Sequence, residues 1–275
     1  MVPRFVLYEP DDSARAVVVV CHGLNLHPDR MATICELLRV SGALVVRMAL
    51  SGHRQDYEEL TAVTRETWLD DHRAILSDLS RVCAEHGTST LLPVGFVGQS
   101  LGALTFCDFQ LNHRPEGACL PRVRRALFLA PAIALRPTTQ LLRPLAAISR
   151  RLPVPSASSP VDRVFGRLPA AAYRALYESY DAVRGTLETR PLDIPLTIVC
   201  HPKDELVSAK GIARLIETGS LAAADLLLLS HDPAARGTAH LAVDEDTMGA
   251  ANWCRFANLA ARFVANLARD SSKDT

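Results

Sequence analysis

The chain has 275 residues, which is enough for one large α/β domain, and nothing in the sequence demands a second. Its 30 Lys and Arg residues balance 30 Asp and Glu residues, so no overall charge favours nucleic acid or another polyanion as a partner. The seven cysteines are scattered and include no C-x-x-C pair, which argues against a disulfide framework and a structural zinc site. Most lie in apolar runs, so we interpret them as core residues in a reducing compartment.

The first residues of the chain and the length of its apolar runs are informative about cellular location. Residues 1–16 lack the long apolar region and cleavage site of a signal peptide. No run of eighteen apolar residues is present, so we expect no transmembrane helix and no stable membrane insertion. The sequence therefore predicts a cytoplasmic protein.

Short apolar runs predict a sheet. Residues 4–9 alternate before Pro10, as in an edge strand, whereas residues 16–21 form a continuous β-branched run typical of a strand buried on both faces. Further strands are predicted at 43–49, 94–97, 125–130, 196–200 and 226–229. Helical spacing of apolar residues predicts helices around 31–38, over 66–83, after residue 100 and over 247–268. Alternating strands and helices indicate a mostly parallel sheet, with ligands bound at the carboxyl ends of its strands.

Residues 131–190 interrupt this alternation. The segment is rich in proline and has no convincing buried strand, although helical pieces are predicted at 138–151 and 170–183. We interpret it as an inserted lid over the functional edge of the sheet, rather than a separate domain. It holds nine arginines and four acidic residues, which indicates either a solvated face or a basic surface for anionic substrates or lipid headgroups.

The stretch 93–108, PVGFVGQSLGALTFCD, predicts a strand, a sharp turn and a helix around a G-x-S-x-G pattern. A serine at the apex of such a turn is held in a strained backbone conformation above the end of the strand. Gly98 and Gly102 lie where side chains would collide as strand and helix fold back. A plain glycine-rich turn is the alternative interpretation of Ser100.

A serine hydroxyl needs an imidazole to accept its proton, and the imidazole needs a carboxylate on its other nitrogen. Asp204 directly follows the strand at 196–200, and His240 follows the last predicted strand. The order Ser100, Asp204, His240 along the chain is the one that accompanies a serine in this strand, turn and helix context.

Three alternatives to these assignments stay open. Glu205 and Asp232 are rival acids, and His231 is a rival base that directly follows a strand. Asp204 itself has two other interpretations, a helix cap before residues 206–216 or half of a surface pair with Lys203.

His22-Gly23-Leu24 after one strand, GQSLG after a later one, and then the Asp and the His together resemble the α/β-hydrolase family across nearly the whole chain outside 131–190. The sequence resembles in particular small bacterial carboxylesterases and monoacylglycerol-lipase-like proteins. The resemblance implies an α/β-hydrolase fold: a mostly parallel central sheet with helices on both faces, a core of residues 1–130 and 191–275, and an inserted helical lid at 131–190.

The resemblance also implies a role for individual residues. Ser100 is the nucleophile, Asp204 the orienting acid and His240 the base, while the backbone N–H groups of Leu24 and Leu101 form an oxyanion hole. The residues expected to support these turns are His22, Gly23, Gly98, Gln99 and Gly102. For His22, direct substrate contact is the alternative.

Two further features resemble the family. Residues 51–54 are similar to its Gly-His-Gly turn, with Arg54 in place of the second glycine, and on this resemblance His53 contacts substrate. The pair Trp68 and Asp71 also resembles the family, although packing of a helix against the sheet is sufficient to explain Trp68.

We therefore expect a serine hydrolase that cleaves carboxylic esters through an acyl-serine intermediate, without a metal or organic cofactor. The expected partner is a small-molecule ester, and the leucine- and alanine-rich lid favours an apolar acyl group. A thioesterase, acyltransferase or amidase would use the same three residues. The alternative from another class is a non-catalytic protein that binds a small molecule on this scaffold.

Overall fold

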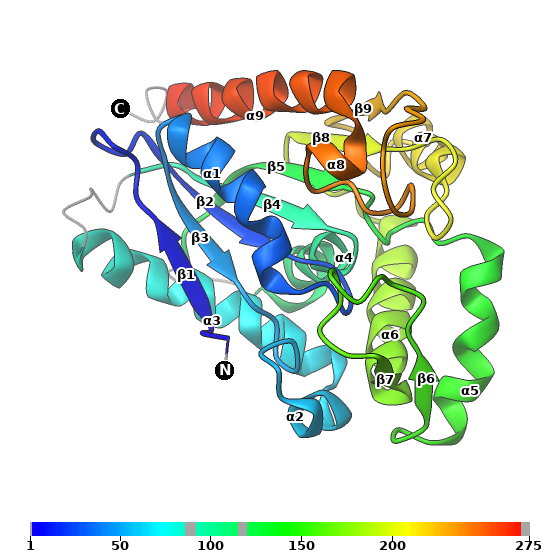
Figure 1. The fold of residues 1–275 in the computed structure, drawn as a ribbon. Coiled ribbons are helices and arrows are strands. Elements are labelled where there is room, and N and C mark those ends of the chain that lie inside the picture. The colour runs from blue at the N-terminus through cyan, green and yellow to red at the C-terminus, as the bar shows by residue number, and fades with distance from the viewer. Residues whose placement is uncertain (1, 86–91, 115–119, 271–275) are drawn as a thin grey trace.

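A computed structural model describes residues 2–85, 92–114 and 120–270, and its centre is a seven-stranded sheet (Figure 1). The strands lie in the order β1-β3-β2-β4-β5-β8-β9, and only the pairing of β1 with β3 is antiparallel among those of this sheet in the described residues. The strands of the sheet are β1 Phe5–Tyr8, β2 Ala16–Cys21, β3 Ala43–Met48, β4 Val94–Gln99, β5 Val123–Leu129, β8 Leu196–Cys200 and β9 Ala224–Leu228. The predicted fold class, an α/β fold with a mostly parallel sheet, is confirmed.

Helices cover both faces of this sheet. The helices of the described residues are η1 Pro28–Met31, α1 Ala32–Val40, α2 Tyr57–Ala62, α3 Arg65–Glu85, α4 Leu101–Asp108, η2 Phe109–His113, η3 Pro137–Leu142, α5 Arg143–Ile148, α6 Ala170–Leu187, α7 Ala209–Glu217, α8 Glu245–Met248 and α9 Ala250–Asp270. Alternate residues of β2 point to opposite faces, so Val18 packs in one core with α1 and α9, while Val19 packs in the other with α3 and α4. Every residue of β2, β3 and β4 is buried, which explains their largely apolar sequences; Arg47 on β3 and Gln99 on β4 are the polar exceptions.

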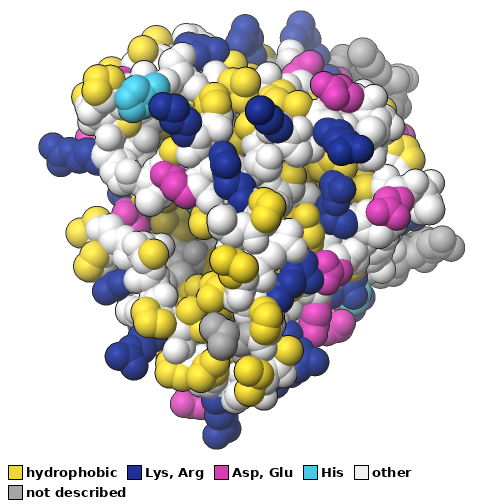
Figure 2. All heavy atoms as spheres, turned by 90° about the vertical axis from the view of Figure 1, so that its right-hand side faces the viewer, with side chains coloured by type: hydrophobic (Ala, Val, Ile, Leu, Met, Phe, Trp, Pro, Cys, Tyr) yellow, Lys and Arg dark blue, Asp and Glu magenta, His cyan; other side chains and the backbone are white. Residues whose placement is uncertain are grey.

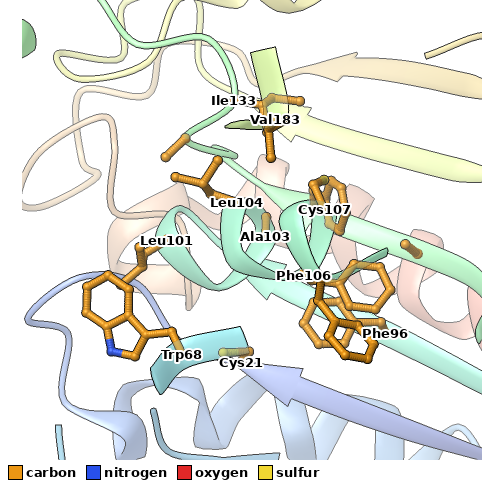
Figure 3. Packing of buried hydrophobic residues seen from close by; sticks show 14 of the residues in the cluster. Cys21, Trp68, Phe96, Leu101, Ala103, Leu104, Phe106, Cys107, Ile133 and Val183 are labelled. Atoms are coloured by element: carbon orange, nitrogen blue, oxygen red, sulfur yellow. The ribbon is translucent and has the colours of Figure 1, made fainter. Parts of the chain in front are cut away.

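The larger core lies around α4 (Figure 3). The rings of Phe96 on β4 and Phe106 on α4 stack with centroids 3.9 Å apart. Leu101, the first residue of α4, is fully buried, as is Trp68 on α3. The start of α4 is therefore held between the sheet and α3, and this fixes the position of the residue before it, Ser100.

Residues 131–190 contribute no strand to the central sheet within the described structure. Helix α6 packs against α4 with an alanine-rich buried face, as the predicted helix at 170–183 anticipates. The helix predicted at 138–151 is shorter and forms as η3 and α5. The expectation of no buried strand is wrong, because β6 Pro153–Pro155 pairs with β7 Arg167–Pro169, whose last two residues are buried. Strands of three residues are too short to show a sequence period, and proline is tolerated where no ladder N–H is needed.

The outer surface of this insertion, which we define as residues 131–190, carries exposed apolar side chains. Leu141, Ile148 and Val161 are 75%, 77% and 79% exposed. Figure 2 looks onto the side where α5 lies and shows hydrophobic side chains gathered on its lower part, with Lys and Arg side chains around them. Several arginines of the insertion are engaged internally, as Arg143 is with Asp181 and Arg174 with Glu178.

The carboxyl-terminal helix differs from its prediction. It begins at Ala250, and residues 245–248 form the separate short helix α8. Gly249 between them has φ 81° and ψ 151°, a conformation in which almost only glycine is found, so one continuous helix cannot form.

The cysteines largely follow the interpretation as core residues. Those described as free and buried are Cys21, Cys35, Cys83, Cys107 and Cys200. Cys254 is exposed on α9, and Cys119 lies outside the described residues. None of the helices in 2–85, 92–114 and 120–270 combines the length and hydropathy needed to cross a membrane.

Candidate active site

Ser100 occupies the turn between β4 and α4 with a strained backbone. Its φ of 47° lies in a region that non-glycine residues rarely adopt, as the sequence pattern predicts. The turn is held from the neighbouring strand and from α4, because the Ser100 N–H donates to the Leu129 carbonyl at 2.9 Å and the Ser100 carbonyl accepts from Leu104 at 3.1 Å. The hydroxyl is thus presented at the carboxyl end of the sheet from a rigid support.

The two glycines of the motif are required by close backbone approaches. A Cβ at Gly98 would lie 2.7 Å from the Ala103 nitrogen, so this position allows helix α4 to fold back on β4 as predicted. A Cβ at Gly102 would lie 2.7 Å from the His22 carbonyl oxygen. Gly102 therefore accommodates the end of β2, the neighbouring strand, rather than the strand that leads into its own turn.

The three residues selected from the sequence lie in one chain of hydrogen bonds. The Nε2 atom of His240 is 2.8 Å from Ser100 Oγ, and its Nδ1 atom is 2.9 Å from Asp204 Oδ2. The side chain of Asp204 is fully buried and that of His240 is 12% exposed. A neutral His240 with its proton on Nδ1 donates to Asp204 and leaves Nε2 free to accept from the serine hydroxyl.

Asp204 stands directly beyond β8 in a turn that its own carboxylate stabilises. Its Oδ1 atom accepts from the N–H groups of Leu206 and Val207, both at 2.8 Å. Arg136, the sixth residue of the insertion, donates from Nε to the Asp204 carbonyl. The helix that follows is capped by Ser208, which accepts from Gly211, so the alternative of Asp204 as the cap of that helix is wrong.

Glu205, the rival acid, has a different position. Its two carboxylate oxygens accept from the backbone N–H groups of Ala239 and His240, at 3.0 and 3.1 Å. It therefore holds the histidine loop by its backbone and does not contact the imidazole. The sequence alone does not indicate this contact, because it joins positions 34 and 35 residues apart.

The other rivals lie away from the serine hydrogen bond. His231 is exposed, and its ring centroid is 6.5 Å from that of His201. Asp232 accepts from the N–H of Ala234 at 2.9 Å, as in a local turn. Gln99, expected to support the turn, donates from Nε2 to the His240 carbonyl at 3.4 Å.

The His22-Gly23 turn lies against the serine turn. A Cβ at Gly23 would be 1.9 Å from the Gln99 side chain and 3.2 Å from Ser100 Cβ, so a side chain there would require Gln99 to move. Leu24 follows Gly23, and Leu101 follows Ser100 as the first residue of α4, where a helix N–H has no partner within the helix. These two residues therefore lie beyond the ends of two adjacent parallel strands, β2 and β4.

His22 has both ring nitrogens engaged with backbone groups. Nδ1 donates to the Gly23 carbonyl at 2.8 Å, and Nε2 accepts from the Leu50 N–H at 3.1 Å. This pattern requires the neutral ring, and burial, helped by the nearby His53, holds the pKa of His22 well below its ordinary value. The residue is fully buried, which favours the supporting role over substrate contact.

His53 is also fully buried, so this structure does not support the expected substrate contact. Its Nε2 accepts from the Asn25 N–H at 3.0 Å, and Nδ1 faces the Ser51 carbonyl at 3.4 Å. Burial lowers the pKa of His53 to about 4, so the ring stays neutral at neutral pH. The hydrogen bond from the Asn25 N–H to His53 therefore holds the backbone just after Leu24 in place.

The turn that carries His53 is itself held by α3. The carboxylate of Asp71 accepts from the Ser51 N–H at 2.7 Å and from the Ser51 hydroxyl at 2.9 Å. Trp68 donates from its indole to the Ser51 carbonyl at 3.1 Å. Trp68 thus does more than pack against the sheet, and the pair noticed in the sequence supports the site through two turns.

The arrangement has the elements of nucleophilic catalysis: a hydroxyl, an imidazole that accepts its proton, and a buried carboxylate that orients the imidazole. No group of three or more His, Cys, Asp or Glu side chains suited to a metal ion occurs within the described ranges.

The comparisons with known proteins agree with this architecture. Residues 12–164 match the family described as serine aminopeptidase, S33. No curated protein matches the chain significantly.

The chain is similar to several solved structures. A soluble variant of monoglyceride lipase from Saccharomyces cerevisiae in complex with a substrate analogue shares 13% identity and a TM-score of 0.75, over 96% of this chain and 91% of that one. Monoacylglycerol lipase from Paleococcus ferrophilus shares 15% identity and a TM-score of 0.67, over 96% and 98%. Mouse alpha/beta hydrolase domain-containing protein 10 shares 17% identity and a TM-score of 0.62, over 96% and 94%.

At such identities these similarities establish the fold alone. The family match is different in kind, because residues 12–164 are more than half of the 275 residues. The chain therefore belongs to the serine aminopeptidase, S33 family of α/β hydrolases.

Proposed function

We propose that this protein hydrolyses carboxylic esters through an acyl intermediate on Ser100. The observation that carries the proposal is the continuous hydrogen-bond chain from Ser100 through His240 to the buried Asp204. Membership of a hydrolase family supports it, as does the similarity of the fold to lipases.

In the first half of the reaction His240 Nε2 takes the hydroxyl proton as Ser100 Oγ bonds to the ester carbonyl carbon, and the carbonyl electrons move to oxygen. When the tetrahedral species collapses, the bond to the leaving oxygen breaks and the imidazolium returns its proton to that oxygen, which leaves as an alcohol. Asp204 stabilises the imidazolium in both steps.

In the second half, His240 takes a proton from water as the water oxygen attacks the acyl-serine. The bond between the acyl carbon and Oγ breaks, the proton passes to Ser100, and the carboxylic acid leaves. The backbone N–H groups of Leu24 and Leu101 stabilise the oxyanion in both halves. The closeness of the Gly23 and Ser100 turns supports this placement, and such donors are worth about 10²–10³ in kcat each.

The insertion, residues 131–190, acts as a lid in this proposal, with 1–130 and 191–275 as the core. Helix α6 packs directly on α4, the helix that follows the nucleophile, with a buried face rich in alanine. The leucine- and alanine-rich composition of the insertion supports an apolar acyl group as the substrate feature.

The family description gives a second candidate, hydrolysis of an aminoacyl amide, and the same three residues would perform it. A substrate comparison separates the two. p-Nitrophenyl esters of graded acyl length and aminoacyl p-nitroanilides are assayed side by side with the wild type and with Ser100→Ala. Esters are expected to give the higher kcat/KM, with an optimum at one chain length, and Ser100→Ala is expected to abolish turnover. Preferential cleavage of the aminoacyl anilides contradicts ester hydrolysis.

A further inference from the structure

Asn25 lies one residue beyond Leu24, in the turn that bears the proposed oxyanion donor. Its backbone adopts φ 57°, in the left-handed region that asparagine enters more readily than most residues. The residue is 2% exposed, and its N–H donates to His53 on the core side.

The side chain of Asn25 reaches across to the insertion. Its amide nitrogen donates to the Ser156 hydroxyl and to the Phe165 carbonyl, both at 2.9 Å. Its amide oxygen accepts from the Phe165 N–H, also at 2.9 Å. One side chain thus makes three hydrogen bonds to a segment more than 130 residues away in the sequence.

Backbone contacts continue this junction on both sides of Asn25. The Asn25 carbonyl accepts from Val164 at 3.0 Å, and the Asp162 carbonyl accepts from His27 at 2.8 Å. Leu26 and Arg163 form an antiparallel bridge. Residues 25–27 and 162–165 are therefore paired along their length, and Ser156 adds a separate contact.

An ion-pair cluster extends the junction toward the histidine. Arg30 contacts Asp162 at 2.8 Å and Asp244 at 2.7 Å. Asp244 caps α8, which begins five residues after His240. The insertion, the turn after β2 and the segment after His240 meet at this guanidinium.

We propose that Asn25 is a positioning residue through which segment 156–165 of the insertion sets the conformation of the turn that carries Leu24. This inference rests on the proposed function for its catalytic consequence. The N–H of the peptide between Leu24 and Asn25 is bonded to His53 in the core. The side chain of Asn25 is bonded to Ser156 and Phe165 in the insertion. Displacing the insertion at this junction removes one of the two supports, so an oxyanion donor is in place only while segment 156–165 is docked.

The test uses Asn25→Gly, because glycine tolerates the left-handed backbone and keeps the N–H bonded to His53 while losing all three side-chain bonds. Ser156→Ala weakens the same junction from the insertion side. Arg143→Gln is the matched control, since it breaks an ion pair with Asp181 that lies entirely inside the insertion. Each variant is assayed for kcat and KM on the preferred p-nitrophenyl ester and for inhibition by a trifluoromethyl ketone, which forms a tetrahedral adduct with the serine.

Asn25→Gly is expected to lower kcat about 10- to 100-fold, which is less than the effect of removing a whole oxyanion donor. It is expected to weaken inhibition by the ketone by a similar factor. KM is expected to stay within about twofold, because ground-state binding does not use the oxyanion hole. Ser156→Ala is expected to show the same pattern to a smaller extent, and Arg143→Gln to match the wild type. The proposal is overturned if Asn25→Gly keeps the wild-type kcat and the wild-type inhibition by the ketone. It is also overturned if Arg143→Gln loses as much kcat as Asn25→Gly does.

Hydrogen exchange gives a readout independent of activity. Amides of residues 24–27 are expected to exchange faster in Ser156→Ala than in the wild type, with those of α9 unchanged. Unchanged exchange at 24–27 in both Ser156→Ala and Asn25→Gly also overturns the coupling. A wild type that cleaves no ester but shows the exchange effect rejects the proposed function and leaves the coupling standing, so the two failures are distinguishable.

Discussion

Glu205 shows how a residue without contact to the reacting atoms can govern them. Its two oxygens accept hydrogen bonds from the consecutive N–H groups of Ala239 and His240. These bonds fix the backbone position from which the imidazole of His240 extends. A carboxylate beside a histidine that becomes charged during the reaction also stabilises that charge.

Replacing Glu205 is therefore expected to lower kcat with little effect on KM. Glu205→Ala removes both bonds and should cost about tenfold, whereas Glu205→Gln keeps one accepting oxygen and should cost less. Steady-state kinetics of the two variants on one chromogenic ester check this. Equal losses in both would show that the charge, rather than the bonds to the loop, is what matters.

The assignment of acid and base is tested by paired substitutions. His240→Ala and Asp204→Asn are each expected to lower kcat by about 10⁴, because they remove the base or its orienting partner. His231→Ala and Asp232→Asn are expected to change it by no more than a few-fold, since neither contacts the serine or the imidazole. A large loss at His231 with a small one at His240 contradicts the assignment.

At this scale the sequence predicted that Ser100, Asp204 and His240 lie together, because in a parallel sheet residues that follow different strands gather at one edge. It did not predict the contacts of Glu205 or Asn25. Those contacts depend on how loops meet in three dimensions, and no local pattern encodes a partner 34 or 140 residues away. The sequence shows the resemblance of the His53 turn to that of the family. The burial of His53 and its hydrogen bond to Asn25 depend on α3 and on the turn after β2, which the sequence does not show.

At the scale of elements, Gly249 and Gly185 allow a matched test of helix formation, because one lies between two helices and the other lies inside a helix. Gly249 separates α8 from α9 with φ 81°, and a Cβ there would lie 2.1 Å from Asp232 Oδ2. Gly185 lies inside α6 with nothing within 4 Å of an added Cβ.

Gly249→Ala is expected to destabilise the fold by about 1–3 kcal/mol, the cost of forcing a side chain into this backbone conformation. Gly185→Ala is expected to stabilise it by up to about 1 kcal/mol through helix propensity. Urea unfolding of both variants measures the two free energies. A neutral Gly249→Ala would show that position 249 accepts a helical residue, as the helix predicted over 247–268 requires.

Elements with a long period or a continuous apolar run were predictable. The run at 16–21 gives β2 with the same bounds, and the spacing over 66–83 gives most of α3. The elements that the sequence did not predict are short, or they depend on residues that cap a helix. Helix α2 begins after Asp56, whose side chain accepts from Glu59, a capping signal that was present in the sequence. Strands β6 and β7 have no such signal, and β7 lies against α6 and α2, contacts that no local pattern encodes.

At the scale of the whole molecule, buried neutral histidines link stability to pH. Burial lowers the pKa of His72 to about 3 and that of His53 to about 4, and that of His22 also lies well below its ordinary value. In the unfolded chain these groups titrate near 6.5. Between that pH and about 4 the unfolded state binds more protons than the folded state, so stability is present above pH 6.5 and is lost as the pH falls.

Each such histidine contributes up to about 1.4 kcal/mol per pH unit to this slope. His72 lies away from the catalytic turns and contacts Thr105 at 2.8 Å, so His72→Gln keeps a hydrogen-bonding side chain there while removing the titration. Urea unfolding between pH 4 and 6.5 is expected to give a shallower loss of stability in the variant than in the wild type. Parallel curves would mean that His72 does not take part in the linkage.

The organisation of the whole chain was the most predictable level, since the alternation of strands and helices selects a mostly parallel sheet. The insertion was located by its composition, but its anchoring to the turn after β2 was not. That anchoring is made by backbone groups, by Asn25 and by the ion pair of Arg30 with Asp162, and none of these has a compositional signature.

Covalent labelling tests the central claim most directly. Folded wild-type protein, treated with a fluorophosphonate and analysed by intact mass and peptide mapping, is predicted to gain one adduct, located on Ser100. Ser100→Ala, shown to be folded by its unfolding temperature, is predicted to gain none, and His240→Ala to react far more slowly. Folded wild-type protein that stays unlabelled, or that carries its adduct on another residue, contradicts the account.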